Sequence, residues 1–271
     1  MEHERPTAVV TGGASGLGLA LCQELQARGI HTVILDLRAP PRGSLKPALS
    51  GYRWLDLQDT PTLRTTLAEI RQSHGRIDWL VNNAGICVAG QIRDLASEDF
   101  QRVMAVNFTA AVEATLTVLP AMRARGAGTV VNIASVAGLF PCPTLSPYGA
   151  AKAALVNFSE SIRLECRNDG VRVITVCPGF LDTPLFQRAE LRAVDREAVL
   201  RRMPLGRLPV DEAARLILQG VARNRSPLVF PAYARLGLWV HRNLPGLYSL
   251  MVRKNIRMFQ RSRVETADPG S

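Results

Sequence analysis

Three side chains near the middle of the sequence have the types and spacing needed to move a proton at a substrate oxygen. Tyr148 and Lys152 lie four residues apart in a helical pattern, and therefore on one helix face, while Ser135 follows a short apolar run. A free tyrosine titrates near pH ~10, and a nearby ammonium group favours its phenolate, so we expect Lys152 to lower the pKa of Tyr148. Tyr148 would then act as acid and base, with Ser135 holding the substrate oxygen.

Each of these residues also has an ordinary structural explanation. A tyrosine and a lysine at this spacing commonly mark a solvated helix face, and a serine after a strand commonly caps a helix. We favour the catalytic interpretation because both segments lie near the carboxyl ends of predicted strands, where a cofactor crevice forms in parallel sheets.

A glycine-rich segment near the N-terminus is suited to binding the pyrophosphate of a dinucleotide. Residues 11–18 (TGGASGLG) follow a β-branched run and precede a helical pattern. Glycine lets the backbone turn sharply and approach a phosphate closely, and the free N–H groups and dipole of a helix N-terminus favour an anion. The residues expected to bind the cofactor at this turn are Gly12, Ser15, Gly16, Leu17 and Gly18.

The choice between the two nicotinamide cofactors depends on the end of the next strand pattern. Asp36 ends the run HTVILD, about 20 residues after the glycine turn, where a carboxylate accepts hydrogen bonds from both ribose hydroxyls and repels a 2′-phosphate. We therefore expect a preference for NAD(H). Arg38 could pair with that phosphate, so NADP(H) stays the alternative, although the glycine turn itself contains no basic residue.

The strands and helices that position these residues alternate along the chain. The strand patterns are near-continuous apolar runs, which is typical of parallel strands covered on both faces. We therefore predict an α/β class, a single doubly wound Rossmann domain with about seven parallel strands and helices on both faces. The predicted strands are residues 7–11, 31–36, 52–57, 77–81, 129–133, 171–177 and 228–230, and the predicted helices are 17–28, 97–125, 148–167 and 212–223.

Composition sets the compartment that we expect. The five cysteines are odd in number and contain no C-x-x-C spacing, which argues against a zinc site or a disulfide framework and favours a reducing cytoplasm. The N-terminal residues do not have the pattern of a secretory signal, and we find no run of about 18 unbroken apolar residues typical of a membrane span.

The order of these motifs resembles the short-chain dehydrogenase/reductase family over residues 7–230. The motifs, in sequence order, are Gly12-x-x-x-Gly16-x-Gly18, Asp56, Asn82-Asn83-Ala84-Gly85, Asn107, Ser135, Tyr148-x-x-x-Lys152, and Pro178-Gly179 with Thr183. The resemblance implies an oxidoreductase that moves a hydride between a nicotinamide cofactor and an alcohol or ketone. It also implies a homodimer or a homotetramer.

The resemblance assigns further roles to single residues. It implies that Tyr148 and Lys152 bind the cofactor as well as act in catalysis, with Lys152 on the nicotinamide ribose. Asn107 would hold a water that links Lys152 to solvent, although a buried asparagine bonded to backbone is a common alternative. The remaining implied contacts are Asp56 and Leu57 with the adenine, Asn83, Ala84 and Gly85 with the adenosine ribose, and Pro178, Gly179 and Thr183 with the nicotinamide carboxamide.

Two apolar segments are expected to border the substrate. Residues 136–143 (VAGLFPCP) follow Ser135, and residues 180–186 (FLDTPLF) follow Gly179. An apolar pocket favours a lipophilic alcohol or ketone, such as a steroid, retinoid or fatty derivative, although such a lining is common whatever the substrate. The alternative function is a membrane-peripheral or cofactor-sensing protein of the same fold with little turnover.

The positive charge of the chain lies near its C-terminus. The formal net charge is +10, and residues 201–263 contain 13 Lys and Arg but two acids. We divide the chain into a catalytic domain, residues 1–231, and a basic amphipathic extension, residues 232–271. The extension is expected to form two short helices, over residues 233–263, that break at Pro245-Gly246.

The second of these helices has the pattern of an amphipathic basic helix. Its expected apolar face carries Tyr248, Val252, Ile256 and Phe259, and its expected basic face carries Arg253, Arg257 and Arg261. Packing on the core or on a neighbouring subunit is the interpretation that we place first, and an anionic membrane surface is the second. Nucleic acid comes last, because no recognised nucleic-acid-binding module accompanies the helix.

Overall fold

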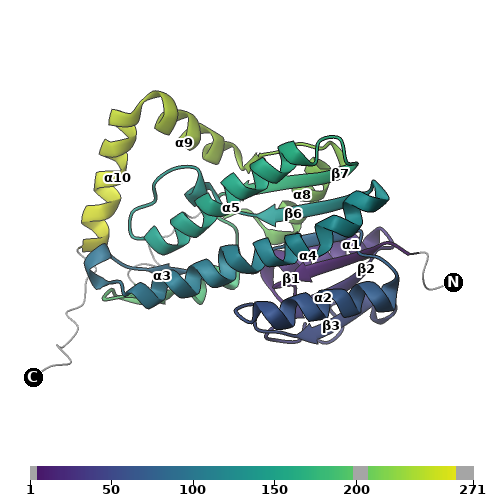
Figure 1. Cartoon of the computed structure of the whole chain (residues 1–271). Coiled ribbons are helices and arrows are strands. Elements are labelled where there is room, and N and C mark those ends of the chain that lie inside the picture. The colour runs from purple at the N-terminus through teal and green to yellow at the C-terminus, as the bar shows by residue number, and fades with distance from the viewer. Residues whose placement is uncertain (1–4, 198–206, 261–271) are drawn as a thin grey trace, which may run out of the picture.

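The main strands of the chain form a seven-stranded parallel sheet in the order β3-β2-β1-β4-β6-β7-β9 (Figure 1). The computed structural model describes residues 5–197 and 207–260. The architecture confirms the α/β class and the parallel sheet predicted from the sequence. The strands are β1 (Thr7–Thr11), β2 (His31–Asp36), β3 (Ser50–Trp54), β4 (Trp79–Asn82), β6 (Gly128–Ile133), β7 (Val171–Pro178) and β9 (Leu228–Phe230).

Helices cover both faces of this sheet (Figure 1). Helices α1 and α8 share one buried cluster, which contains Leu21 and Ile217, while α2, α4 and α5 share another, which contains Leu67, Val118 and Ile162. The central strands therefore bury both of their faces, as their continuous apolar runs predict, whereas the edge strand β3 is partly exposed. The helices are α1 (Gly16–Ala27), α2 (Thr60–His74), α3 (Ser97–Met104), α4 (Ala110–Arg125), α5 (Ser146–Glu165), α6 (Pro184–Gln187), α8 (Val210–Ala222), α9 (Ala232–Asn243) and α10 (Pro245–Gln260).

The strand order reverses at β1. This strand pairs in parallel with β2 on one side and with β4 on the other, so that Thr11 lies beside both Leu35 and Asn82. In an open parallel sheet, ligands bind outside the carboxyl ends of the strands at such a reversal. The segments that follow β1 and β4 therefore meet at the place where a dinucleotide is expected.

The segment from Ser97 to Arg125 is divided, so the expectation of one continuous helix is wrong. Between α3 and α4 the chain makes a π-helical turn, Ala105–Thr109, which contains Asn107. A π turn widens the helix locally and is frequent at functional sites. Here the wider turn directs Asn107 toward the loop after β4, with which its side chain makes hydrogen bonds.

The same stretch is the one helical segment of the described residues that is long and apolar enough to cross a membrane, with a mean hydropathy of 1.4. Its apolar side chains are used in the fold. Ala110, Ala114, Val118 and Met122 are buried in the cluster that α4 shares with the sheet. Helix α4 is therefore a core helix of the α/β fold.

A second, two-stranded sheet lies beside the main one. Strand β5 (Val88–Ala89), after β4, pairs in parallel with β8 (Glu190–Leu191), after β7. The pairing holds the segment after α6 against the loop that carries the Asn-Asn-Ala-Gly motif. Two loops distant in sequence thus form neighbouring walls at the carboxyl ends of the strands.

The C-terminal segment forms two helices, α9 and α10, as the sequence predicts (Figure 1, yellow). The break falls at Leu244, next to the predicted Pro245-Gly246. Residues 261–263, which belong to the predicted second helix, lie outside the described residues.

Candidate active site

The glycine turn has the backbone geometry of a phosphate-binding loop. Gly12 adopts φ +64°, and a Cβ atom at this position would lie 2.7 Å from the Cα of Ala84. A Cβ atom on Gly18 would collide with the carbonyl of Gly12. Only glycine permits the left-handed turn and the close approach of these segments. Helix α1 begins at Gly16, so its N-terminal N–H groups lie at the turn.

The turn is hydrogen-bonded to the loop after β4. Thr11 Oγ1 accepts hydrogen bonds from the backbone N–H of Asn83, at 3.1 Å, and of Ala84, at 3.2 Å. The Asn83 amide donates to the carbonyl groups of Thr11, at 3.1 Å, and Gly12, at 3.0 Å. The structure thus brings two predicted cofactor-binding segments together, and the glycine turn with the free N–H groups of α1 suits the pyrophosphate of a dinucleotide.

Asp36 lies at the end of β2 beside the turn. One carboxylate oxygen accepts a hydrogen bond from Ala14 N at 3.0 Å, and the other accepts one from Arg38 N at 3.1 Å. The backbone thus fixes the carboxylate next to the turn. Within the described residues, Arg38 forms no ion pair, so a basic side chain also lies near this end of the crevice.

The structure reveals a second cation at the turn, which the sequence interpretation missed. Arg188, at the C-terminus of α6, lies with Nη1 3.5 Å from Ser15 Oγ. In the part of the chain that the structure describes, no carboxylate pairs with it. Its segment reaches the turn because Pro184 packs beside Gly16, where a Cβ atom would lie 3.1 Å from the proline Cδ.

The two residues expected at the adenine follow β3. Asp56 Oδ1 accepts a hydrogen bond from Gln58 N at 2.9 Å, which fixes its carboxylate in a tight turn. Leu57 is buried in the core cluster that contains α2. The Leu57 side chain is therefore committed to packing, and only its backbone is available to a ligand.

Ser135 and Tyr148 lie together beneath the carboxyl ends of β6 and β7. Ser135 follows β6 and accepts a hydrogen bond from Ala137 N at 3.2 Å, so it also caps a short 3-10 turn. Tyr148 lies in the first turns of α5 and is 4% exposed. Burial raises the pKa of Tyr148 above its usual range, while a hydrogen bond with Ser135 opposes that rise. The expected lowering by Lys152 is wrong, because the cost of burying a phenolate dominates.

Lys152 is buried one helical turn after Tyr148. Its Nζ donates a hydrogen bond to the carbonyl of Ile133 at 2.7 Å and lies 5.8 Å from the centre of the Tyr148 ring. Burial lowers the pKa of Lys152 to about 8, and the nearby Cys177 thiol partly opposes this effect. The amine therefore titrates near neutral pH, within reach of the tyrosine ring.

Asn107 completes the group of residues predicted to act in catalysis. Its amide nitrogen donates to Ile86 O at 2.9 Å, and its oxygen accepts from Ile86 N at 2.8 Å. Gly85 lies between Asn107 and Lys152, since a Cβ atom on it would be 3.4 Å from Asn107 Oδ1 and 3.6 Å from Lys152 Nζ. Asn107 thus has the bonds to backbone that the sequence left as an alternative, and it lies close to the buried amine.

A buried chain of amides fixes the helix that carries Tyr148. Asn82 donates to Asn132 Oδ1 at 2.8 Å, and Asn132 donates to Ser159 Oγ at 2.8 Å. These residues come from β4, β6 and α5. The chain of bonds sets the position of α5 against the sheet, although the side-chain oxygen of Asn82 is buried without a hydrogen-bond partner among the described residues.

The residues after β7 complete the crevice. Pro178 ends β7, and Gly179 N donates to Phe230 O at 2.8 Å. Thr183 precedes α6 without capping it, so its hydroxyl is not used by the helix. A Cβ atom on Gly179 would lie 2.6 Å from Tyr233 Oη, so helix α9 packs directly against this segment.

The wall opposite α5 is apolar. Tyr148 shares a buried cluster with Cys87, Ala137 and Ala189, and partly buried side chains pack around it. The Phe186 ring lies 6.5 Å from the Tyr148 ring, between centroids. Residues from both segments predicted to border the substrate, including Cys142, Leu185 and Phe186, belong to this surface.

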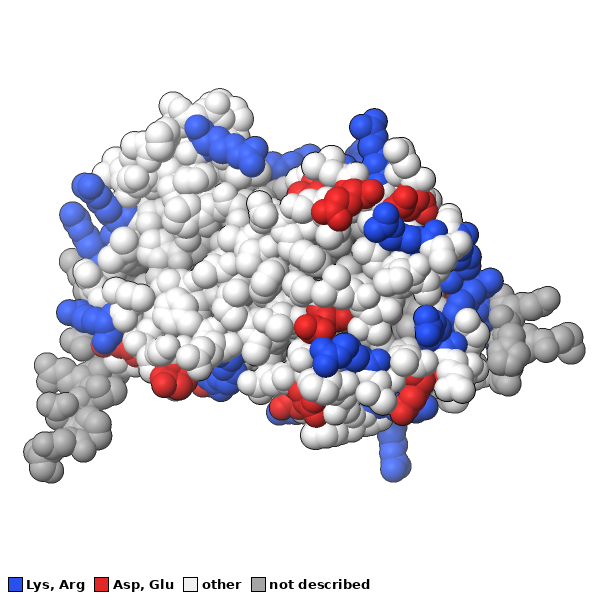
Figure 2. All heavy atoms as spheres, viewed as in Figure 1, with Lys and Arg blue, Asp and Glu red and all other residues white. Residues whose placement is uncertain are grey.

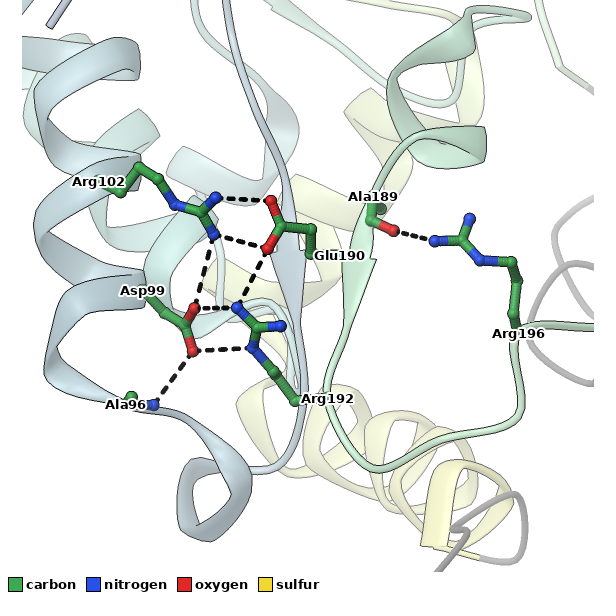
Figure 3. Close-up of polar contacts among 7 residues, drawn as sticks. All are labelled: Ala96, Asp99, Arg102, Ala189, Glu190, Arg192 and Arg196. Atoms are coloured by element: carbon green, nitrogen blue, oxygen red, sulfur yellow. Dashed lines mark hydrogen bonds and ion pairs between the residues drawn. The ribbon is translucent and has the colours of Figure 1, made fainter. Parts of the chain in front are cut away.

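Four charged residues hold that wall in place (Figure 3). Arg192 donates to Asp99 at 2.6 and 3.1 Å, and Arg102 donates to both carboxylate oxygens of Glu190 at 2.7 Å. Arg192 also pairs with Glu190 at 3.0 Å. We call these residues the four-residue ion cluster. It joins α3 to β8, next to Ala189 of the apolar wall, and the sequence interpretation did not include it.

Comparisons with known proteins agree with this arrangement. A model of the short chain dehydrogenase family matches residues 6–193. The chain is 36% identical over 207 residues to 2-(R)-hydroxypropyl-CoM dehydrogenase of Xanthobacter autotrophicus, and the aligned region covers 73% of this chain and 83% of that protein. It is 30% identical over 258 residues to dehydrogenase/reductase SDR family protein 7-like of Anopheles gambiae, covering 91% and 81%.

A solved structure has the same fold. It is that of a short-chain dehydrogenase from Streptomyces avermitilis, with a TM-score of 0.81 at 26% identity, and the match covers 95% of this chain and 99% of that one. The sheet order, the phosphate turn and the matched length agree. The chain therefore belongs to the short-chain dehydrogenase/reductase family and is an NAD(P)-dependent oxidoreductase that acts on CH–OH groups.

Proposed function

We propose that this enzyme interconverts a lipophilic secondary alcohol and its ketone, with Tyr148 as the acid and base. One observation carries the proposal. Tyr148 is buried close to the Ser135 hydroxyl, and the Lys152 amine lies 5.8 Å from the centre of the Tyr148 ring. These three groups can hold a substrate oxygen and exchange its proton.

Three side chains would have separate roles in the proton transfer. Ser135 would donate a hydrogen bond to the substrate oxygen, and Tyr148 would give that oxygen its proton in reduction or remove it in oxidation. Lys152 supplies positive charge that stabilises the phenolate when the proton has left. When bound, the nicotinamide ring donates or accepts the hydride, and in its oxidised form it adds a positive charge to the site.

The protonation states of the two groups suit the donation of a proton in the reduction step. Burial raises the pKa of Tyr148, so the phenol is protonated at neutral pH and can serve as a donor. Lys152, with a pKa of about 8, is mostly charged below that pH. A protonated phenol near a cation suits proton transfer to a developing alkoxide.

The preference for a lipophilic substrate is supported by the apolar wall. Tyr148 is surrounded by Ala137, Cys142, Ala189 and Phe186, and none of these side chains offers a charge to a polar substrate. Predominantly apolar pockets with a few placed polar groups bind apolar ligands. A steroid, retinoid or fatty alcohol fits this chemistry.

The cofactor contacts that we propose follow the crevice. The pyrophosphate would be held by the residues of the glycine turn, which are Gly12, Ser15, Gly16, Leu17 and Gly18. The contacts with the adenine, the two riboses and the nicotinamide would be those that the resemblance implies. The carboxylate of Asp36, fixed by Ala14 N, supports NAD(H) over NADP(H). Arg38 and Arg188 are the cations that would favour the phosphorylated cofactor.

We propose a homodimer or homotetramer in the cytoplasm, with residues 1–231 as the catalytic unit and residues 232–271 as its extension. Exposed apolar side chains on neighbouring helices support association, because Leu116 on α4 is 58% exposed and Leu164 on α5 is 62% exposed. All five cysteines are free, which supports a reducing compartment.

Replacement of Tyr148 by Phe tests the acid and base role. The variant removes only the hydroxyl, so we expect hydride transfer to fall by about 10²-fold or more while cofactor binding is retained. The assay follows NADH and NADPH absorbance with a panel of alcohols and ketones of increasing apolar size. Turnover that equals that of the wild type would refute the role of Tyr148, and a preference for small polar substrates would refute the lipophilic class.

The competing function is a cofactor-sensing protein with little turnover. The intact arrangement of Ser135, Tyr148 and Lys152 favours catalysis, because a sensing role does not require a buried amine beside the phenol. Cofactor binding without turnover over the whole substrate panel would favour sensing.

A further inference from the structure

The outer surface of the C-terminal helices is unusually apolar. Twelve large hydrophobic side chains are exposed in the part of the chain that the structure describes, and seven of them lie within residues 233–251. Single exposed apolar residues are common, whereas a concentration of this kind marks an interaction surface. Six of the seven, which we call the outer face of α9 and α10, are Leu236, Trp239, Leu244, Leu247, Leu250 and Met251, with exposures of 44–65%. The seventh, Tyr233, is 45% exposed but turns its hydroxyl toward the core, where it accepts a hydrogen bond from Phe180 N.

The inner face of the same helices is occupied by the enzyme. Tyr248 donates a hydrogen bond to Pro141 O at 2.5 Å, and its ring lies 5.7 Å from that of Phe140. Val252 and Ile256 are partly buried on the same side. The apolar face predicted from the sequence is therefore the packing face, and the outer face carries a second apolar surface.

Basic residues are interleaved with the outer face. Leu236, Trp239 and Arg242 follow one another at intervals of three, and Leu250 is followed by Arg253 and Arg257 three and seven residues later. At these intervals the residues of each set lie on one side of their helix. Arg253 and Arg257 of the predicted basic face are exposed, away from the packing face, and the outer face adds apolar residues beside them.

The charge of this surface has one sign. Helices α9 and α10 contain five basic residues and no acidic one: Arg235, Arg242, Arg253, Lys254 and Arg257. Figure 2 shows a largely uncharged surface over α9 with Lys and Arg at its border and no acidic group there. Two copies of this face would bring like charges together, which disfavours a second copy of the chain as its partner.

We propose that the outer face of α9 and α10 binds the surface of an anionic phospholipid bilayer. Leucine and methionine side chains would enter the boundary between headgroups and acyl chains, and the guanidinium groups would reach lipid phosphates. Tryptophan is enriched at that boundary, which suits Trp239. Nucleic acid also offers phosphates, but it offers no apolar layer for the six apolar side chains of the outer face.

The helices that carry this face are bonded to the two segments predicted to border the substrate. Tyr233 Oη accepts a hydrogen bond from Phe180 N at 2.7 Å, and Tyr248 binds Pro141, so both helices are bonded to segments that border the substrate. A lipophilic substrate could pass from the bilayer to the pocket over a short distance. This last step depends on the proposed function, whereas binding to the bilayer does not.

Co-sedimentation of the full chain with lipid vesicles tests the proposal. We expect binding to vesicles of phosphatidylcholine mixed with phosphatidylglycerol, weaker binding as salt is raised, and little binding to phosphatidylcholine alone. Each basic residue near an anionic surface contributes about fivefold in affinity, so Arg253→Gln with Arg257→Gln should lose about 30-fold. The matched charge control is the double variant Arg71→Gln with Arg93→Gln, at two exposed residues far in sequence from α9 and α10. This variant should bind the vesicles as the wild type does.

The apolar contribution is tested in the same way. Leu250→Ser should weaken binding by about tenfold or more, since it removes a side chain that would enter the bilayer, while Ile92→Ser, at a similarly exposed site, should not. Trp239 fluorescence should shift to shorter wavelength on anionic vesicles, and this shift should be lost in Trp239→Phe.

Three results would overturn the proposal. They are absence of binding to the mixed vesicles at low salt, equal losses in the outer-face variants and their controls, and dissociation of an oligomer by Leu250→Ser without any vesicle binding. The third result would assign the outer face to a second copy of the chain. Circular dichroism and turnover of each variant show that it is folded, and turnover that survives loss of vesicle binding separates this proposal from the proposed reaction.

Discussion

Arg192, which follows β8, donates two hydrogen bonds to Asp99 on α3, at 2.6 and 3.1 Å, and thereby connects two segments 93 residues apart. The Asp99 side chain is 4% exposed, so its charge depends on this partner. Hydrogen bonds from Arg192 and from Ala96 N, together with the positive charge of Arg192 and Arg102, hold the pKa of Asp99 below its usual value. The pair is the most buried part of the four-residue ion cluster.

Loss of Arg192 is expected to disturb substrate binding more than chemistry. Arg192→Ala leaves a buried carboxylate without its closest partner, although Ala96 N and Arg102 remain, and should cost about 1.5–3 kcal/mol of unfolding free energy. Because Ala189 and Phe186 lie in the same segment, the KM for the ketone should rise more than kcat falls. Urea unfolding and steady-state kinetics measure both effects. Arg93→Ala, an exposed arginine near the same helix, is the control, and equal effects in both variants would contradict the assignment.

The Arg188 side chain is expected to bind a cofactor phosphate. A charge-assisted hydrogen bond contributes about 1.5–3 kcal/mol, so Arg188→Gln should raise the KM for the cofactor by about tenfold or more with little change in kcat. An equal rise for NADH and NADPH would place the arginine at the pyrophosphate, and a rise for NADPH alone would place it at the 2′-phosphate. Unchanged KM values for both cofactors would show that the contact with Ser15 has no role in binding.

Asp36 is expected to set the cofactor preference. A carboxylate facing a 2′-phosphate costs several kcal/mol, so Asp36→Ser should improve kcat/KM for NADPH by about 10²-fold while it lowers that for NADH. Arg38 would then be free to pair with the phosphate. Parallel assays with both cofactors give the ratio. A wild-type enzyme that already prefers NADPH would contradict our interpretation of this residue.

Lys152 is expected to trade stability for activity. Its pKa falls from 10.5 to about 8 in the folded chain. Each pKa unit corresponds to ~1.4 kcal/mol, so burial of the charged amine lowers the free energy of unfolding by about 3 kcal/mol at neutral pH. Removing the amine abolishes this cost but also loses the hydrogen bond to Ile133, which contributes about 1–2 kcal/mol of stability. Lys152→Met should therefore be inactive and yet more stable by about 1–2 kcal/mol.

The pH dependence gives an independent check of the same residue. Between pH 8 and 10.5 the unfolded chain binds more protons at Lys152 than the folded chain does, so wild-type stability from this group rises with pH in that window. Below about pH 8 the cost is fully present. Thermal unfolding of wild type and Lys152→Met should therefore converge as the pH rises. A constant difference across the window would show that burial of the amine is not its cause.

The sequence predicted most strands of the sheet well, because they are continuous apolar runs flanked by glycine or a polar turn. The edge strand β3 (Ser50–Trp54) is not such a run, and its prediction at residues 52–57 is shifted toward the C-terminus. Helix α2 was missed, although Leu63, Leu67 and Ile70 lie on one of its faces. Its remaining residues are mostly polar and its helix propensity is modest, so tertiary packing of those three side chains determines the helix. Its start is fixed by Asp59, whose side chain accepts from Thr62 N at 3.1 Å.

The parts of the site that could not be predicted depend on contacts between distant segments. Arg188 meets Ser15 across 173 residues, and Arg192 meets Asp99 across 93, and neither pair has a local sequence signature. The pKa of Tyr148 was predicted in the wrong direction for a related reason. Helical spacing showed that Lys152 is near, but the burial that outweighs the lysine arises from residues of other elements.

The bonds from Tyr233 to Phe180 and from Tyr248 to Pro141 give the last two helices a share in the shape of the pocket. Without these bonds, the loops that contain Phe180 and Pro141 would lose their contacts with α9 and α10. Proteins shortened by these helices would therefore not report the substrate selectivity of the full chain. Exchanging these helices between relatives, with every catalytic residue untouched, is therefore a route to altered substrate range. Sequence divergence in α9 and α10 would then change the range of substrates that the enzyme accepts.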